Sequence, residues 1–351
     1  MKRLSLFLSA VFTIAMLVSC NNGTPQNAQG SWIDNYLATA DLSMKPPSAT
    51  STPPITVSGP FGENVEEHPD LISRVVLPQD YYSKEVLDNQ LKTSYSLINK
   101  RDWKTATREL LEYLRHKPDD VEASFLLSVA FGGDGDLARE EKMLARTLEL
   151  RPEHPFANYN LGCCRMARGQ DVEALAAFDR ALRRSPSLLG AICNKARIAM
   201  KWNMFEPAFE LLSIAAGLAP EDDRILNDLG ICAERTGRID AAVAFYARAL
   251  SVTPNSGEIL DNYSGCLATA GMIGSAMDVI SKWQEVEPKS WRPLYRLACL
   301  YCRLGNIGRA ADMYTQAVAF GFADTDWAAA DPDLAPLFTA RPELLEVSKN
   351  D

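Results

Sequence analysis

Cys299 and Cys302 form a C-x-x-C pattern, a spacing that suits disulfide, redox or metal chemistry. In redox enzymes such a pair sits at the start of a helix, where the helix dipole lowers the pKa of a thiol. Here both cysteines fall in the middle of a helical pattern, which favours packed core residues. A thiol-dependent activity of this pair is the alternative function, and it predicts a perturbed thiol pKa.

Five further cysteines lie between residues 163 and 266, so the chain has seven cysteines besides Cys20, an odd number. Three of them recur in phase with a 34-residue interval, as expected for small core residues. A disulfide between Cys163 and Cys193 is a second possibility. The five are Cys163, Cys164, Cys193, Cys232 and Cys266.

The N-terminal segment, residues 1–19, has the composition of an export signal. Lys2 and Arg3 precede an apolar stretch that ends at Val18 and is too short for a typical membrane span. Ser19 and Cys20 close it in a way that resembles the bacterial lipobox, whose cysteine is lipidated and becomes the first mature residue. The resemblance implies a membrane-anchored lipoprotein with Cys20 as the lipidation site, and no cofactor is expected besides this covalent lipid.

Residues 20–74 are rich in Pro, Ser, Thr, Asn and Gly and have little apolar periodicity. Such a stretch cannot bury enough surface to fold alone, so we expect a disordered, lipid-anchored tether. Asn21 follows the lipidation site. In enterobacterial lipoproteins, an Asp at this position retains the protein in the inner membrane, so the resemblance implies sorting to the outer membrane. The expected location is therefore the outer membrane, facing the periplasm.

An alanine-rich amphipathic segment that ends in proline recurs every 34 residues. Six closing prolines keep this register, from Pro118 to Pro288, which indicates a repeat array. We number the positions of each 34-residue unit from its first residue. The residue at position eight is small in all seven units, and the residue at position twenty is alanine in six of them. Large residues at position twenty-four fill the space beside them. Glycines at position fifteen, such as Gly135 and Gly169, are expected to end each first helix.

This pattern resembles the tetratricopeptide repeat family, in which each unit is a helix-turn-helix. The resemblance implies an all-α superhelix of about seven repeats, preceded by a lead-in at residues 75–86 and followed by a C-terminal cap at residues 325–351. The units span residues 87–120, 121–154, 155–188, 189–222, 223–256, 257–290 and 291–324.

In this family the first helices line a concave groove that binds a peptide or helix of another protein. Positions two, five, nine, twelve and thirteen generally face the groove, and aromatic and arginine residues are typical anchors there. The implied partner-binding residues are Tyr95, Phe125, Tyr159, Met166, Arg197, Lys201, Asn227, Glu234, Arg235, Arg292, Tyr295 and Arg303.

Three charged residues depart from the pattern at places where the family has apolar side chains: Glu140, Arg165 and Lys195. Because an unpaired buried charge is costly, each must find a partner or reach water. We expect Glu140 to pair with Arg165. The alternative is a basic pocket for an acidic segment, in which Arg165 and Lys195 join Arg197 and Lys201.

The remaining features favour a non-catalytic adaptor in assembly of a cell-envelope complex, such as a pilus or secretion system. A net charge of −9 argues against nucleic-acid binding, and the chain lacks phosphate-loop, hydrolase and zinc-protease motifs. The stretch FGGDGD is best explained as a turn, and no metal site is expected. A homo-oligomeric scaffold is a further alternative.

Overall fold

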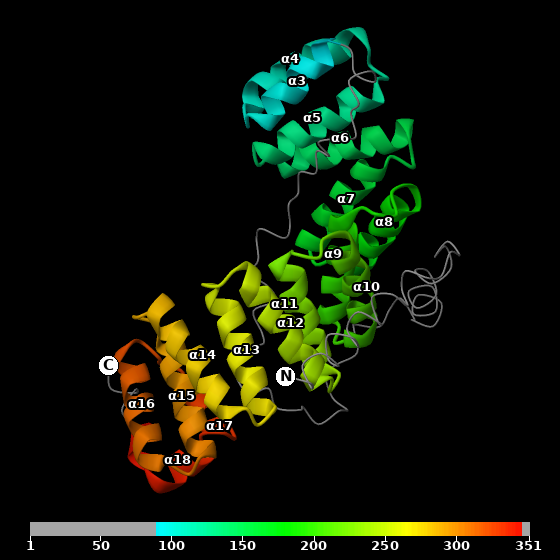
Figure 1. The fold of residues 1–351 in the computed structure, drawn as a ribbon. Coiled ribbons are helices and arrows are strands. Elements are labelled where there is room, and N and C mark those ends of the chain that lie inside the picture. The colour runs from blue at the N-terminus through cyan, green and yellow to red at the C-terminus, as the bar shows by residue number, and fades with distance from the viewer. Residues whose placement is uncertain (1–88, 346–351) are drawn as a thin grey trace, which may run out of the picture. The chain divides into compact units, whose positions relative to one another are not determined.

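The computed structural model describes residues 89–345, and within that range it contains helices and no strands (Figure 1). The all-α fold is confirmed, and each predicted 34-residue unit contains one helix pair. The pairs are α3 (Asn89–Asn99) with α4 (Trp103–His116), α5 (Val121–Gly133) with α6 (Leu137–Leu150), α7 (Pro155–Ala167) with α8 (Asp171–Arg184), α9 (Leu189–Lys201) with α10 (Phe205–Leu218), α11 (Asp223–Arg235) with α12 (Ile239–Val252), α13 (Gly257–Thr269) with α14 (Ile273–Val286), and α15 (Trp291–Arg303) with α16 (Ile307–Ala319).

The predicted signal, the lipidation site Cys20, the tether and the lead-in lie outside the described residues. Among the helices that are described, none combines the length and the apolar character needed to cross a bilayer.

From α3 to α16, each helix packs against the next along the chain, and first helices also contact first helices of neighbouring units. The pairs α3–α5, α7–α9, α11–α13 and α13–α15 pack in this way. Second helices of adjacent units make no comparable contact. First helices are therefore closer together, and they form the inner side of the superhelix.

The turn inside each unit has the same backbone geometry in all seven repeats. The residue at position fifteen has a positive φ. The amide of position sixteen donates a hydrogen bond to the carbonyl of position eleven, as in a Schellman motif. Glycine occupies this position five times, as expected. Arg101 and Asn203 adopt the same conformation in units one and four, with φ of 60° and 58°. Gly135 and Asp136 of the FGGDGD stretch serve this turn, and Asp136 caps α6.

The alternation of small and large residues brings the two helices of a unit together. A Cβ atom added at Gly162 would lie 2.5 Å from the ring of Phe178, and one at Gly230 would lie 2.5 Å from the ring of Tyr246. Since Cβ atoms do not approach carbon atoms so closely, position eight must stay small where position twenty-four is aromatic.

The predicted pair of Glu140 and Arg165 is wrong in its partner, because Arg165 pairs with Glu141 at 2.9 Å. Glu140 is buried, and Gly132 leaves the room for it, since a Cβ there would lie 2.8 Å from the Glu140 carboxyl carbon. Lys195, which is 1% exposed, pairs with Asp179 at 2.5 Å.

The C-terminal cap is confirmed as two short helices and a 3₁₀ turn. They are α17 (Thr325–Ala330), α18 (Ala335–Ala340) and η3 (Pro342–Leu345). Phe322, which replaces the usual closing proline, is buried between the last unit and this cap. Its ring centroid lies 4.9 Å from that of Trp291 and 5.0 Å from that of Tyr295, so the cap covers an apolar end that would otherwise face water.

Candidate partner-binding face

The inner face comprises the side chains that the first helices α3, α5, α7, α9, α11, α13 and α15 direct away from their own second helices. Positions in the repeat decide which side chains reach it. The twelve implied partner-binding residues fall into a buried set and an accessible set.

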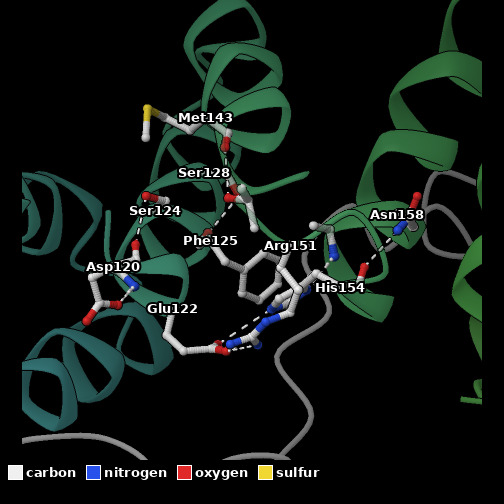
Figure 2. A network of polar contacts seen from close by, with 12 residues as sticks. Asp120, Glu122, Ser124, Phe125, Ser128, Met143, Arg151, His154 and Asn158 are labelled. Atoms are coloured by element: carbon white, nitrogen blue, oxygen red, sulfur yellow. Dashed lines mark hydrogen bonds and ion pairs between the residues drawn. The ribbon is translucent and has the colours of Figure 1, made fainter. Parts of the chain in front are cut away.

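The buried set corrects the sequence prediction at position five. Phe125, Tyr159, Asn227 and Tyr295 are between 0% and 3% exposed, so they do not line an open surface. Each reaches the following unit or the cap instead. Figure 2 shows Phe125 beside His154, the N-cap of α7, with ring centroids 4.6 Å apart.

The other three position-five residues make equivalent junctions. The Tyr159 hydroxyl lies where a Cβ at Gly190 would meet it, and burial raises the Tyr159 pKa. The Tyr295 hydroxyl donates to Asp331 of the cap at 2.8 Å. Asn227 bonds across to unit six, as described next. Position five therefore locks adjacent units together.

Polar junctions pair position five with position six of the next unit. Asn262 donates to Asn227 at 3.0 Å, and Arg296 donates to Asp261 at 2.7 Å. Burial raises the Asp261 pKa, and Arg296 opposes that shift. Glu234, also implied for the groove, is buried as well and accepts from Tyr246 at 3.2 Å.

The accessible set contains seven residues, four of them partly buried and three exposed. The partly buried residues are Tyr95, Met166, Arg197 and Arg292, and the exposed ones are Lys201, Arg235 and Arg303.

Most charges of the alternative basic pocket are neutralised by carboxylates of this chain. Arg165 and Lys195 are paired as described above, and Lys201 contacts Asp171 at 2.9 Å. Arg303, outside that pocket, likewise holds both carboxylate oxygens of Asp333, at 3.0 and 2.7 Å. The pocket prediction is therefore wrong for these residues.

Arg197 and Arg235 differ from Lys201 and Arg303 of the accessible set. Among residues 89–345, neither has a carboxylate within salt-bridge distance. The guanidinium of Arg235 lies over the ring of Phe205, 4.8 Å from its centroid. The two arginines lie on the first helices of adjacent units, α9 and α11, so their charges are available to an acidic group from outside.

Sequence reasoning missed two buried asparagines, one on the first helix α7 and one on the first helix α9. Asn160 and Asn194 are fully buried. Within residues 89–345, both polar atoms of the Asn160 side chain and Oδ1 of Asn194 have no hydrogen-bond partner. Both occupy position six, where Asp228, Asn262 and Arg296 are also polar. This recurrence was the available signal.

Comparison with known proteins agrees with this geometry. The tetratricopeptide repeat family model matches residues 135–188 and 194–257. This part of the chain matches tetratricopeptide repeats. A search of curated protein sequences gave no match.

Solved structures with similar folds include proteins described as tetratricopeptide repeat proteins. The chain is similar to PilF of Pseudomonas aeruginosa (16% identity, TM-score 0.50, covering 60% of this chain and 96% of PilF). It is also similar to the APC/C hetero-tetramer Cut9–Hcn1, with 14% identity and a TM-score of 0.52, covering 74% of this chain and 50% of that one. A third similar structure is YrrB, described as having an unusual peptide-binding site, with 20% identity and a TM-score of 0.47, covering 53% of this chain and 96% of YrrB. At these identities the likeness shows the fold alone.

The cysteines of the repeats behave as core residues. All seven described cysteines are free and buried, and Cys163 and Cys193 form no disulfide. Burial raises the pKa of Cys299 well above its ordinary value and that of Cys302 to about 11. Because a thiolate is the reactive form, this environment disfavours the redox alternative.

One group of possible metal ligands lies beside the C-x-x-C. The donor atoms of Cys299, Asp331 and Asp333 are within 4.8 Å of one another. However, Asp331 accepts from Tyr295, and Asp333 accepts two bonds from Arg303. These carboxylates attach the cap to the last repeat.

Proposed function

We propose that this protein is a non-catalytic, membrane-anchored adaptor that binds an acidic segment of another protein on its inner face. The observation that carries the proposal is the position of Arg197 and Arg235. They are cations on adjacent first helices, and neither has a carboxylate partner in the described part of the chain. Partly desolvated arginines are frequent anchors in protein interfaces.

The membrane anchor is proposed from the sequence of the N-terminal segment. Several acyl chains on Cys20, at about 0.8 kcal/mol per buried CH₂, would hold the protein firmly. The segment between Cys20 and α3 would let the repeats search the space near the membrane, and anchoring would raise the local concentration of adaptor and partner. We place the protein at the outer membrane, facing the periplasm.

The cell-envelope role is proposed from the combination of an export signal, a lipobox and tetratricopeptide repeats. PilF shares the fold, and this likeness is compatible with pilus or secretion-system assembly without identifying either. A homo-oligomeric scaffold is the outcome that size measurements would reveal in place of a foreign partner.

Charge reversal tests the partner face. Crosslinking in intact cells, followed by affinity purification of the full chain, should recover one partner with the native protein. The double variant Arg197→Glu and Arg235→Glu should reduce its recovery at least about tenfold, because each contact of this kind contributes on the order of 1–2 kcal/mol. The matched control is Arg183→Glu with Lys282→Glu, two exposed cations on the second helices α8 and α14.

Equal recovery with both double variants would contradict the proposed face. The anchor is tested separately by Cys20→Ser, which should abolish incorporation of labelled palmitate and release the protein from membranes. Palmitate incorporation by that variant would contradict lipidation at Cys20.

A further inference from the structure

The first helix of unit three begins at a histidine, whereas the other side-chain caps of first helices are Asp or Ser. Each cap is the last residue of the preceding unit, and its side chain accepts a backbone N–H of the first turn. In the part of the chain that the structure describes, the acidic and hydroxyl caps are Asp120, Asp222, Ser256 and Ser290. His154 does the same for α7, since its Nδ1 accepts from the Ala157 N–H at 3.1 Å. Of these residue types, only histidine ordinarily changes charge between about pH 5 and pH 8.

The cap determines which ring nitrogen of His154 carries the hydrogen. Because Nδ1 accepts the Ala157 N–H, it presents a lone pair, and the neutral ring has its hydrogen on Nε2. Nε2 lies 3.5 Å from Oε2 of Glu122 on α5, as Figure 2 shows. A second proton can go only to Nδ1, where it would point at the amide hydrogen of Ala157. A protonated ring in this place therefore cannot cap α7.

The surroundings of the His154 ring are unfavourable for a positive charge. The side chain is 0% exposed, and the ring centroids of Phe125 and Phe156 lie 4.6 and 6.3 Å from its own. A charged imidazole buried in this way loses its hydration. The positive end of the α7 dipole lies at the same place and repels it as well. We therefore expect the ring to leave the cap when it is protonated.

Glu122 is the carboxylate to which a protonated ring would move. Its side chain is 12% exposed and pairs at 2.6 Å with Arg151, which lies in the connection between α6 and α7. The Arg151 side chain is 47% exposed, so this ion pair lies at the surface. A ring that swings toward Glu122 reaches water there and takes up its proton. Protonation then exchanges a helix cap for an ion pair between the ring and α5.

Charged side chains of the neighbouring elements bond to partners other than this ring. Glu122 is the one charged residue of α5, and the first two turns of α7 contain no carboxylate and no cation. The charged side chains with other partners are Glu141 and Arg146 of α6, Glu153 of the connection, and Arg180 and Arg184 of α8. Glu122 and Arg151 are therefore the charged groups that respond to protonation of His154.

The junction between units two and three depends on these side chains. The first helices that pack closely on one another include α3 with α5 and α7 with α9, but α5 and α7 are not such a pair. The start of α7 reaches α5 through the His154 ring, which lies against Phe125 and beside Glu122. Moving the ring out of the cap therefore removes packing between the two units.

We propose that the junction of units two and three is a pH-sensitive joint, in which protonation of His154 uncaps α7 and moves the ring to Glu122. On acidification the Ala157 N–H loses its acceptor, and Phe125 loses a packing neighbour. The orientation of unit two relative to unit three then becomes more variable, so acid changes the inner face that the two units share. This joint works with or without a partner on that face.

Hydrogen exchange of the purified full chain at about pH 7.5 and about pH 5.5 tests the joint. After correction for the intrinsic exchange rate, protection of the peptide that contains Ala157 should fall about fivefold at the lower pH, as for a lost N-cap. His154→Asn places an amide oxygen where Nδ1 accepts and cannot titrate, so it should show no such fall. His116→Asn is the matched control, because His116 is exposed on α4, and it should behave as the native protein does.

Unchanged protection of the start of α7 in the native protein would overturn the proposal. An equal fall in His154→Asn would also overturn it, because another titrating group would then be responsible. Loss of the fall in His116→Asn would assign the response to the exposed histidine instead. Far-UV circular dichroism establishes that each variant is folded. If His154→Asn is unfolded, His154→Ser replaces it under the same criteria, since serine is the cap before α13 and α15.

Discussion

Removing Asp261 should destabilise the repeats more than removing Arg296, although the two share one ion pair. Nε of Arg296 donates to Oδ1 of Asp261 at 2.7 Å, and the side chains are 14% and 6% exposed. In Asp261→Asn the guanidinium loses this carboxylate and cannot release its proton. We expect a loss of about 3–5 kcal/mol in the free energy of unfolding, as for other broken buried pairs.

The reverse change is milder because a carboxyl group can become neutral. Burial already raises the Asp261 pKa, so after Arg296→Leu the carboxyl can take up a proton. The expected loss is about 1–3 kcal/mol, the cost of a buried polar group without its partner. The double variant Asp261→Leu with Arg296→Leu should lose less than Asp261→Asn alone.

Urea denaturation followed by far-UV circular dichroism measures these losses, and hydrogen exchange localises them. Protection should fall first in α13 and α15, because repeats couple mainly to their neighbours. A loss below about 1 kcal/mol in Asp261→Asn would mean that water already screens the pair. A larger loss in Arg296→Leu than in Asp261→Asn would refute the reasoning about the buried charge.

Three further predictions concern buried residues of the repeats. Glu234→Gln should stabilise the protein at neutral pH. Burial raises the pKa of Glu234, so the native state loses stability as the pH rises through that pKa. The gain over wild type, measured by urea denaturation, should vanish at a pH below 4.5, the ordinary pKa of the side chain. Gly230→Ala should cost about 1–3 kcal/mol through its clash with Tyr246, whereas Gly274→Ala, with no neighbour within 4 Å, should gain up to about 1 kcal/mol; a similar effect of both on the melting temperature would contradict the size rule. Cys299 should react with iodoacetamide only after denaturation, and rapid labelling of the native protein would show that the thiol is accessible.

The spacing of small, large and glycine residues was enough to predict the helix pairs. Gly162 and Gly230 face aromatic rings as the size rule requires, and position fifteen forms the same turn even where Arg101 replaces glycine. These features are local, since each depends on two helices of one unit. Sequence spacing fixes them directly.

Contacts between units were predicted less well. Phe125 and Tyr295 were expected on the surface, but the N-cap of the next first helix covers Phe125, and the C-terminal cap covers Tyr295. Glu141 pairs with Arg165 where Glu140 was expected, and one residue along a helix is a rotation of about 100°. The phase of one unit relative to the next comes from packing, which no motif in the sequence specifies.

A photocrosslinking scan of unit four in intact cells tests the central claim most directly. With p-benzoylphenylalanine placed in turn at exposed or partly buried positions of α9 and α10, the yield of the partner crosslink is measured at each site. The account predicts a high yield at Lys201 on α9, and background yields at Ser213 and Gly217 on α10. Equal yields on both helices, or a maximum on α10, would contradict partner binding on the inner face.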